Sequence, residues 1–319
     1  MVESMQNLNK IKATDQPADD TGYHIPVLLN EVLDGLNIKP AGIYVDCTFG
    51  GGGHSKAILG KLGSNAKLIV FDQDANAKQN LPADDRVIFI QQNFRHLQRF
   101  LRVNKHVAVD GILADLGVSS HQFNEADRGF STRFDAALDM RMDKRQQLTA
   151  ADVLKTFSEV QLQKMFEKYG EVTNAKTLAR TIVAQRSITA IKTIGQFKEA
   201  IKSIVKGNPN KYLAQVFQAL RIEVNDEMGS LKEMLEQSVN VLKPGGRIAI
   251  ISFHSLEDRM VKNFFKQGTF EEKENDDVFG RREETSLKII TRKPVIAGDV
   301  ELKNNTRSRS AKLRIAEKK

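Results

Sequence analysis

The sequence IYVDC at residues 43–47, continued by TFGGGGHS at residues 48–55, joins a run of mostly apolar residues to a cluster of four glycines. The apolar run predicts a buried strand, and the glycines predict a tight turn into a helix near 54–62. Glycine lets the backbone approach a ligand closely, and the first N–H groups of a helix point toward a ligand in front of it. This junction is therefore a candidate ligand-binding loop.

The segments around this loop repeat the same alternation of strand and helix. Helices are expected near 94–103 and 256–266, and further strands at 67–72, 86–91, 109–115, 247–252, 286–292 and 311–316. Near-continuous apolar strands separated by helices are typical of a parallel sheet covered on both faces. The sequence therefore predicts an α/β fold with a doubly wound, Rossmann-like sheet.

The middle of the chain has only helical patterns. Three pairs in it place a hydroxyl residue three positions before an acid or an amide, as at a helix N-terminus: Thr149 with Asp152, Ser158 with Gln161, and Thr193 with Gln196. A helical stretch is expected over roughly 211–242, closed by the turn signal Lys243-Pro244-Gly245-Gly246. Ser255 with Asp258 predicts the start of the helix after the 247–252 strand.

These patterns predict how the chain is divided. We expect a disordered polar tail at 1–22, a sheet-containing domain made of 23–124 and 230–319, and an all-helical domain at 125–229 inserted into it. No internal repeat is apparent.

The basic residues are concentrated in two segments. The formal charge is +8, and residues 126–230 carry 17 Lys and Arg against 12 Asp and Glu, whereas residues 286–319 carry 10 against 3. The rest of the chain is slightly acidic. A polyanion such as RNA explains this segregation, although a well-solvated basic protein could have the same total charge. The helical insertion is therefore the expected RNA-recognition domain.

Carboxylates follow three of the expected strands at the edge where the glycine loop lies. Asp72 ends the next strand 22 residues after Gly50, a spacing typical of an acid that binds ribose hydroxyls, and Asp115 ends the fourth strand. The loop lacks the G-x-G-x-x-G dinucleotide pattern and the Gly-Lys-Ser/Thr of a phosphate loop. Asp46 would repel a pyrophosphate but suits the ammonium of a methionine moiety. S-adenosylmethionine is thus the predicted cofactor.

The residue types limit the reaction. Methylation of a pyrimidine at C5 needs a nucleophilic cysteine, but Cys47, the single cysteine, lies beside the cofactor loop and is expected to be packed. Direct transfer to nitrogen or oxygen is favoured instead. Asp115 is the candidate for orienting an amine or the cofactor, with capping of nearby N–H groups as the alternative.

Eight motifs in order resemble the ribosomal RNA small-subunit methyltransferase H family, the cytosine-N4 enzymes of bacterial ribosomes. They are HIPVLLNE (24–31), DCTFGGGGHS (46–55), DLGVSS (115–120) with Gln122, DRGFS (127–131), LDMRMD (138–143), FQALRIEVN (217–225), SFHSLEDR (252–259) and RSRSAKLR (307–314). The resemblance covers the chain from residue 23 onward. It implies methylation of N4 of a cytosine in 16S rRNA within the small ribosomal subunit.

The resemblance also implies a set of cofactor contacts, namely Gly52, Gly53, His54, Asp72, Phe94, Asp115 and Gln122. Phe94 would lie against the adenine ring, or else simply anchor the helix that it opens. His254 would either reach the substrate pocket or make a structural hydrogen bond.

Several broader expectations complete the prediction. The absence of a secretory or membrane-spanning pattern indicates a cytoplasmic protein without membrane contact, and the six histidines show no paired spacing typical of metal ligands. The oligomeric state could be a monomer or a homodimer. Two rival functions are a DNA amino-methyltransferase and an RNA-binding protein that keeps the cofactor fold without catalysis.

Overall fold

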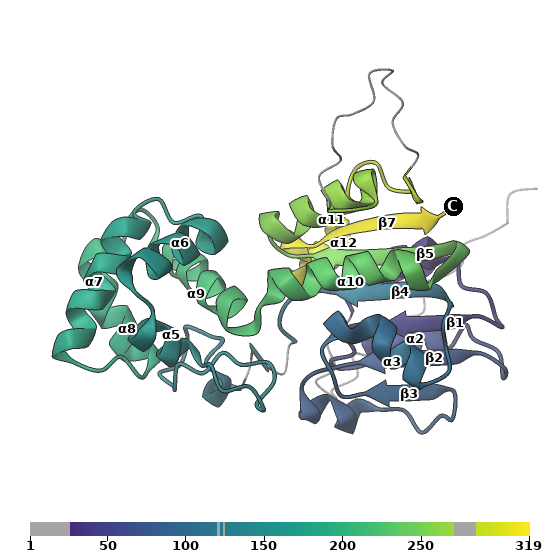
Figure 1. Cartoon of the computed structure of the whole chain (residues 1–319), viewed down its shortest axis with the longest axis horizontal. Coiled ribbons are helices and arrows are strands. Elements are labelled where there is room, and N and C mark those ends of the chain that lie inside the picture. Colours follow the sequence, from purple (N-terminus) through teal and green to yellow (C-terminus); the bar gives the residue numbers. More distant parts are fainter. Residues whose placement is uncertain (1–25, 120–121, 124, 271–284) are drawn as a thin grey trace, which may run out of the picture.

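The computed structural model describes residues 26–119, 122–123, 125–270 and 285–319, and a seven-stranded sheet dominates the part it describes (Figure 1). The sheet order is β3-β2-β1-β4-β5-β7-β6. The first five strands are parallel, whereas β7 runs antiparallel to both β5 and β6. The predicted Rossmann-like α/β class is confirmed. The strands are β1 (Ile43–Asp46), β2 (Lys67–Phe71), β3 (Val87–Ile90), β4 (Val109–Asp115), β5 (Leu242–Ser252), β6 (Leu287–Ile289) and β7 (Lys312–Lys318).

Helices cover both faces of the sheet. Successive side chains of a strand point to opposite faces, so Val45 and Ile112 pack into one buried cluster while Tyr44 and Leu113 pack into another. The first cluster includes residues of α3 (Leu97–Val103), α10 (Glu227–Val241) and α11 (Ser255–Gln267). The second includes residues of α1 (Leu29–Leu36) and α2 (Gly53–Leu59). Burial on both faces explains why the central strands are mostly apolar.

The strand order reverses between β1 and β4. The chain moves outward from β1 through β2 to β3, then returns so that β4 pairs with the opposite edge of β1. In open parallel sheets a ligand crevice forms at the carboxyl ends of the strands where such a reversal occurs. Asp46 ends β1 and Asp115 ends β4, so the topology brings the predicted site residues to this crevice.

The predicted helices of the middle segment are present, and Figure 1 shows them to one side of the sheet. They have their own buried core, which includes Phe166, Leu178, Phe197 and Leu220. All three predicted pairs of the middle segment form reciprocal capping boxes, which confirms those helix starts. The boundaries of an inserted domain at 125–229 stay a prediction. The helices are α5 (Ala150–Thr156), α6 (Glu159–Gly170), α7 (Ala175–Ile188), α8 (Ile194–Ile201) and α9 (Pro209–Asn225).

Two predictions for the segment from 211 to 247 are wrong, namely an unbroken helix and the first residue of β5. The helical stretch at 211–242 is not continuous, because Asp226 adopts a φ of 45° and separates α9 from α10. β5 begins at Leu242 instead of Arg247: Val109 pairs with Leu242 and Gly111 with Arg247, so residues 243–246 bulge out of the ladder.

The predicted start of α11 is also wrong by one residue. His254, not Ser255, is the N-cap, and it forms the capping box with Glu257. Asp258, which the prediction assigned to the cap, instead forms an ion pair with Arg314 of β7 at 2.6 Å. This ion pair links α11 to β7. The predicted tail at 1–22 lies outside the described residues. Among the helices of the described ranges, none has the length and apolar character needed to cross a membrane.

Candidate functional site

The glycine loop after β1 is shaped by Asp46, which is buried at the end of the strand. Its carboxylate accepts hydrogen bonds from the Thr48 N–H at 3.0 Å and from Ser55 Oγ at 2.7 Å. Gly50 and Gly52 have φ angles of +50° and +75°, in the left-handed region that favours glycine. Burial raises the pKa of Asp46 despite these hydrogen bonds. The ammonium contact predicted for Asp46 stays a prediction.

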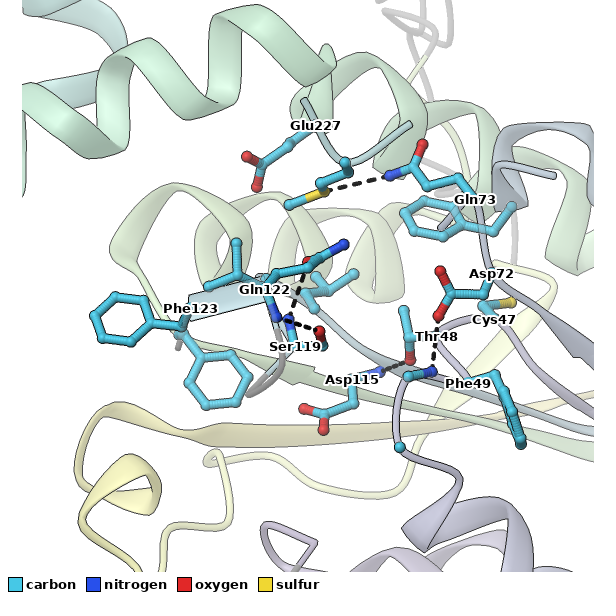
Figure 2. A pocket seen from close by; sticks show the side chains of 18 of the residues that line it. Cys47, Thr48, Phe49, Asp72, Gln73, Asp115, Ser119, Gln122, Phe123 and Glu227 are labelled. Carbon is cyan, nitrogen blue, oxygen red and sulfur yellow. Dashed lines mark hydrogen bonds between the residues drawn. The ribbon is translucent and has the colours of Figure 1, made fainter. Parts of the chain in front are cut away.

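A cavity of about 850 Å³ lies in front of this loop, and carboxylates from two strand ends reach it (Figure 2). Its wall includes the predicted contacts Gly53, His54, Asp72, Phe94, Asp115 and Gln122. Gly52 is absent from the residues that line this cavity. A Cβ at that position would lie 3.0 Å from the Phe49 ring, so Gly52 serves the close packing of the turn. The structure therefore brings together every predicted contact residue except Gly52.

Asp72 stands directly after β2 and is tied to both neighbouring turns. Its Oδ2 accepts a hydrogen bond from the Gly50 N–H and its Oδ1 accepts one from the Asp74 N–H, each at 2.8 Å. Burial raises its pKa to about 6, although these hydrogen bonds act in the opposite direction. Each oxygen retains a second lone pair, so Asp72 can accept further hydrogen bonds from hydroxyl groups in the cavity.

Asp115 occupies the carboxyl end of β4, beside His54 at the start of α2. Its backbone N–H donates to Thr48 Oγ1 at 2.6 Å, which fixes the strand end against the glycine loop. Its Oδ2 lies 3.7 Å from His54 Nδ1, and its Oδ1 is buried without a hydrogen-bond partner among the described residues. Burial raises the pKa of Asp115 to about 6, and the nearby charges of Asp46 and Glu257 act in the same direction. Asp115 is thus a carboxylate with spare acceptor capacity.

Gln122 belongs to a buried polar network next to the cavity. Its Nε2 donates to Asp74 Oδ2 at 2.9 Å, and its Oε1 accepts from the Ser119 N–H at 3.2 Å. Asp74 also pairs with Arg128 Nη1 at 2.7 Å, and the Arg128 side chain is only 2% exposed. Both the oxygen and the nitrogen of the Gln122 amide therefore already make hydrogen bonds to neighbouring residues. The contact of Gln122 with a cofactor stays a prediction.

Replacing Arg128 by methionine should strongly destabilise the protein, because it leaves the buried Asp74 carboxylate without its cation. Removing one partner of a buried pair costs about 3–5 kcal/mol. The matched control is Arg145→Met, because Arg145 forms an ion pair with Asp143 but is 50% exposed, and exposed pairs contribute about 0–1 kcal/mol. Urea unfolding followed by circular dichroism measures both. Equal unfolding midpoints for the two variants would contradict the importance of the buried pair.

Phe94 follows β3, and its predicted contact with an adenine ring stays a prediction. It opens a short 3₁₀ helix, Phe94–His96, in which the Asn93 side chain accepts a hydrogen bond from the Arg95 N–H at 2.9 Å. The ring packs against the buried cluster on the α3 and α10 face of the sheet and also lines the cavity. It therefore anchors the helix while presenting apolar surface on which an aromatic ligand ring can lie.

Cys47 has the packed position expected from the sequence. It is only 2% exposed. Its burial raises the pKa of the thiol well above the ordinary value, and the neighbouring charge of Asp46 adds a smaller effect in the same direction. The reactive form of cysteine is the thiolate, which this environment disfavours. The geometry thus supports the expectation that the cysteine is not a nucleophile.

The wall opposite the glycine loop was not predicted as part of the site. Arg221 near the end of α9 forms two hydrogen bonds with Glu227 at the start of α10, at 2.8 and 3.0 Å, and both residues line the cavity. Asn225 holds this turn in place by accepting from the Met142 N–H at 2.7 Å and donating to the Met140 carbonyl at 2.8 Å. Glu257, from α11, also lines the cavity. Arg221, Asn225 and Glu257 lie in quoted motifs and Glu227 lies just outside one, but no spacing rule predicts that they meet.

Comparison with known proteins identifies relatives along nearly the whole chain. The family model described as the MraW methylase family matches residues 21–319. A protein of Phocaeicola vulgatus named "Ribosomal RNA small subunit methyltransferase H" is 55% identical over 298 residues, which are 93% of this chain and 98% of that protein. A protein of Flavobacterium johnsoniae with the same name is 55% identical over 297 residues, 93% of this chain and 98% of that protein.

Solved structures resemble the chain only distantly. The crystal structure of a putative rRNA-methylase from Clostridium thermocellum is 12% identical, covers 93% of this chain and 100% of that chain, and superposes with a TM-score of 0.43. The fold class is therefore assigned from the strand order, and the family from the sequence relatives.

Proposed function

The chain belongs to the MraW methylase family, whose members are S-adenosylmethionine-dependent methyltransferases, and from this premise we propose that it methylates N4 of a cytosine in small-subunit ribosomal RNA by direct transfer. The relatives named above supply the substrate class of this proposal. The Asp115 carboxylate, which lines the cavity with 26% of its side chain exposed, is the observation that carries the choice of an amine.

The cavity suits an adenosyl cofactor in both size and chemistry. Its volume of about 850 Å³ lies within the usual range for small-molecule sites, with room for a nucleoside. Asp72 can accept hydrogen bonds from the ribose hydroxyls, and Phe94 offers an apolar face to the adenine. Gly53 has no side chain where the loop meets the cavity, and a Cβ there would collide with Pro26 at 2.4 Å. When bound, S-adenosylmethionine supplies a methyl group on a positively charged sulfur.

Asp115 is the residue that we assign to the substrate amine. The lone pair of cytosine N4 is delocalised into the ring, so the amine is a poor nucleophile until a neighbouring group accepts its protons. The Asp115 carboxylate lines the cavity and can accept a hydrogen bond from the N4 amine, which orients the amine and makes its lone pair more available. His54 stands beside the same carboxylate, and its Nε2 donates to the Val27 carbonyl at 2.9 Å, which fixes the ring.

The charge distribution supports an RNA substrate. Residues 126–230 contain 17 Lys and Arg against 12 Asp and Glu, and residues 286–319 contain 10 against 3. Arg307, from the second of these segments, reaches the cavity wall. We propose that the helical segment at 125–229 and the C-terminal segment hold the RNA backbone, with the target base single-stranded or turned out of its stack.

Transfer of a labelled methyl group to isolated small ribosomal subunits tests the proposal. We expect label in the RNA, and digestion to nucleosides with mass spectrometry should identify N4-methylcytidine. Label on C5, on a ribose hydroxyl or on protein would overturn the amine assignment. Parallel reactions with naked RNA and with DNA show whether the assembled subunit is needed and exclude the DNA amino-methyltransferase. Cofactor binding without transfer to any of these substrates would instead favour an RNA-binding protein without catalysis.

A further inference from the structure

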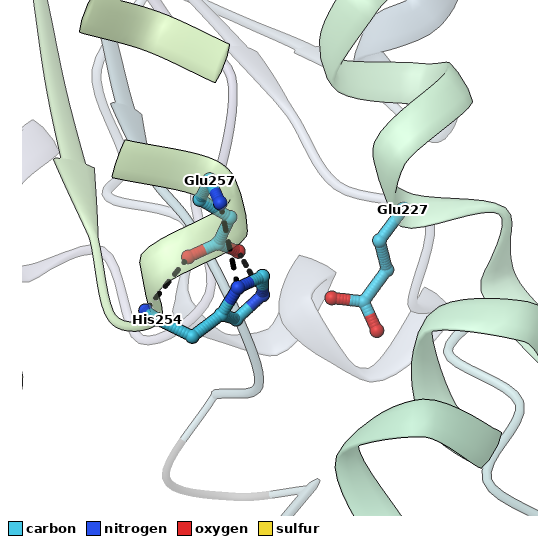
Figure 3. A group of neighbouring side chains, drawn as sticks. All are labelled: Glu227, His254 and Glu257. Atoms are coloured by element: carbon cyan, nitrogen blue, oxygen red, sulfur yellow. Dashed lines mark hydrogen bonds and ion pairs between the residues drawn. The ribbon is translucent and has the colours of Figure 1, made fainter. Parts of the chain in front are cut away.

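Three metal-ligating side chains converge on one side of the cavity (Figure 3). Glu227 starts α10, whereas His254 and Glu257 lie at the start of α11, and one ligand atom from each lies within 4.8 Å of the other two. Figure 3 shows the carboxylates of Glu227 and Glu257 on either side of the His254 ring. The side chains of His254 and Glu257 are only 8% and 3% exposed. The two glutamates also line the cavity, so the cluster is buried on one side and open to a ligand on the other.

The two glutamates are held from behind by separate contacts. Arg221 donates two hydrogen bonds to Glu227, and the Phe253 N–H donates to Glu257 Oε2 at 2.8 Å. Such supporting contacts orient the ligands of protein-bound metals. A metal on His254 Nε2 requires the tautomer with its proton on Nδ1, so the 3.4 Å capping contact from the Glu257 N–H to Nδ1 would be given up when the metal binds.

His254 Nε2 lacks a hydrogen-bond partner. The atom is buried, and although it lies 3.2 Å from Glu257 Oε1, no hydrogen bond of acceptable geometry reaches it among the described residues. A buried ring nitrogen without a hydrogen-bond partner is costly, and a bound ion or water can satisfy it. The unsatisfied nitrogen therefore points to a ligand between His254 and the two glutamates.

The charges also favour a bound cation. The cluster holds two carboxylates and one guanidinium, so it is one positive charge short when His254 is neutral. Both glutamates stand in the first turn of a helix, where the dipole stabilises the carboxylate form. Ionised carboxylates and a neutral imidazole are the forms that bind metals.

We propose that Glu227, His254 and Glu257 bind a divalent transition-metal ion. One imidazole and two carboxylates form a mixed nitrogen and oxygen set that suits Zn²⁺ or Mn²⁺, whereas Mg²⁺ and Ca²⁺ take oxygen ligands. Three protein ligands leave at least one position for water or for an oxygen of the substrate. The ion would also tie the start of α10 to the start of α11. Our sequence prediction of no metal site did not foresee this pairing of two distant segments.

Metal uptake by the full chain, with any affinity tag removed, tests the proposal without RNA or methyl donor. We expect dialysis against Zn²⁺ followed by elemental analysis to find about one tightly held ion per chain. Titration with Mn²⁺, followed by electron paramagnetic resonance, should find one site with a changed spectrum. Glu227→Gln and His254→Asn should each weaken binding by at least about 100-fold, since losing even a supporting contact costs 10–100-fold.

Matched controls separate this site from adventitious binding. Glu236→Gln removes an exposed carboxylate from the same helix, and His106→Asn removes an imidazole outside the cluster, so both should bind like the wild type. Metal should raise the melting temperature of the wild type and of both controls, but not that of Glu227→Gln. This comparison still tests the site if His254→Asn does not fold. Absence of a tightly held ion, or equal affinity in Glu227→Gln and Glu236→Gln, would overturn the site.

Discussion

Replacement of Asp72 by alanine should weaken binding of S-adenosylmethionine by about 100- to 1000-fold. A hydrogen bond to a charged group contributes about 1.5–3 kcal/mol, and we propose that Asp72 makes two with the ribose hydroxyls. Their loss at the lower end of this range, about 3–4 kcal/mol in total, gives the expected change in affinity. The same carboxylate accepts hydrogen bonds from the N–H groups of Gly50 and Asp74, so its loss should also loosen the glycine loop. Isothermal titration calorimetry of the cofactor into the free protein measures the effect directly.

Two further variants separate the ribose contact from a general loss of structure. Asp72→Asn retains an oxygen that can accept from Gly50 but has no charge, and we expect it to bind more tightly than Asp72→Ala and more weakly than the wild type. Asp85→Asn changes an exposed acid in the loop between β2 and β3 and should bind normally. Unchanged cofactor affinity in Asp72→Ala, with an unchanged melting temperature, would refute both the ribose contact and the cofactor position.

The sheet could be predicted from the sequence because its strands have a strong local signal. β1, β2, β3 and β4 are short, mostly apolar runs bounded by turns, as expected of strands covered on both faces of a sheet. The break at Asp226 could not be predicted, because nothing in the 211–242 pattern interrupts its helical periodicity. It results from tertiary packing, in which α9 belongs to the core of the middle segment and α10 to that of the sheet.

Only the wall of the cavity formed by the strand ends could be predicted from the sequence, for a similar reason. Parallel strands end at one edge of a sheet, so carboxylates after β1, β2 and β4 had to meet, and the structure brings Asp72 and Asp115 to one cavity. The opposite wall depends on a contact between α9, α10 and α11. Arg221 pairs with Glu227 across the helix break, and Glu257 approaches them from a segment 30 residues further along the sequence. Periodicity carries no information about such a meeting.

Replacement of Asp115 by asparagine should lower the rate of methyl transfer by about 100- to 10,000-fold, the range typical of a positioned proton acceptor. Asparagine keeps the shape and still offers one acceptor oxygen, but it has no charge with which to draw the protons of the amine. Cofactor affinity should change much less than the rate if Asp115 acts mainly on the amine. Single-turnover kinetics with saturating cofactor and small subunits measure the rate of transfer itself.

The pH dependence gives this assignment its sharpest test, because the pKa of Asp115 is raised to about 6. The ionised carboxylate is the form that accepts protons, so the wild-type rate should rise about tenfold per pH unit below 6 and level off above it. Asp115→Asn should lack this rise, whereas Asp115→Glu should keep a rise at a lower rate. Asp72 also has a pKa near 6, so the cofactor must be saturating at every pH to remove its effect on binding. A rise near pH 6 that persists in Asp115→Asn would assign the titration to another group and leave Asp115 a structural role.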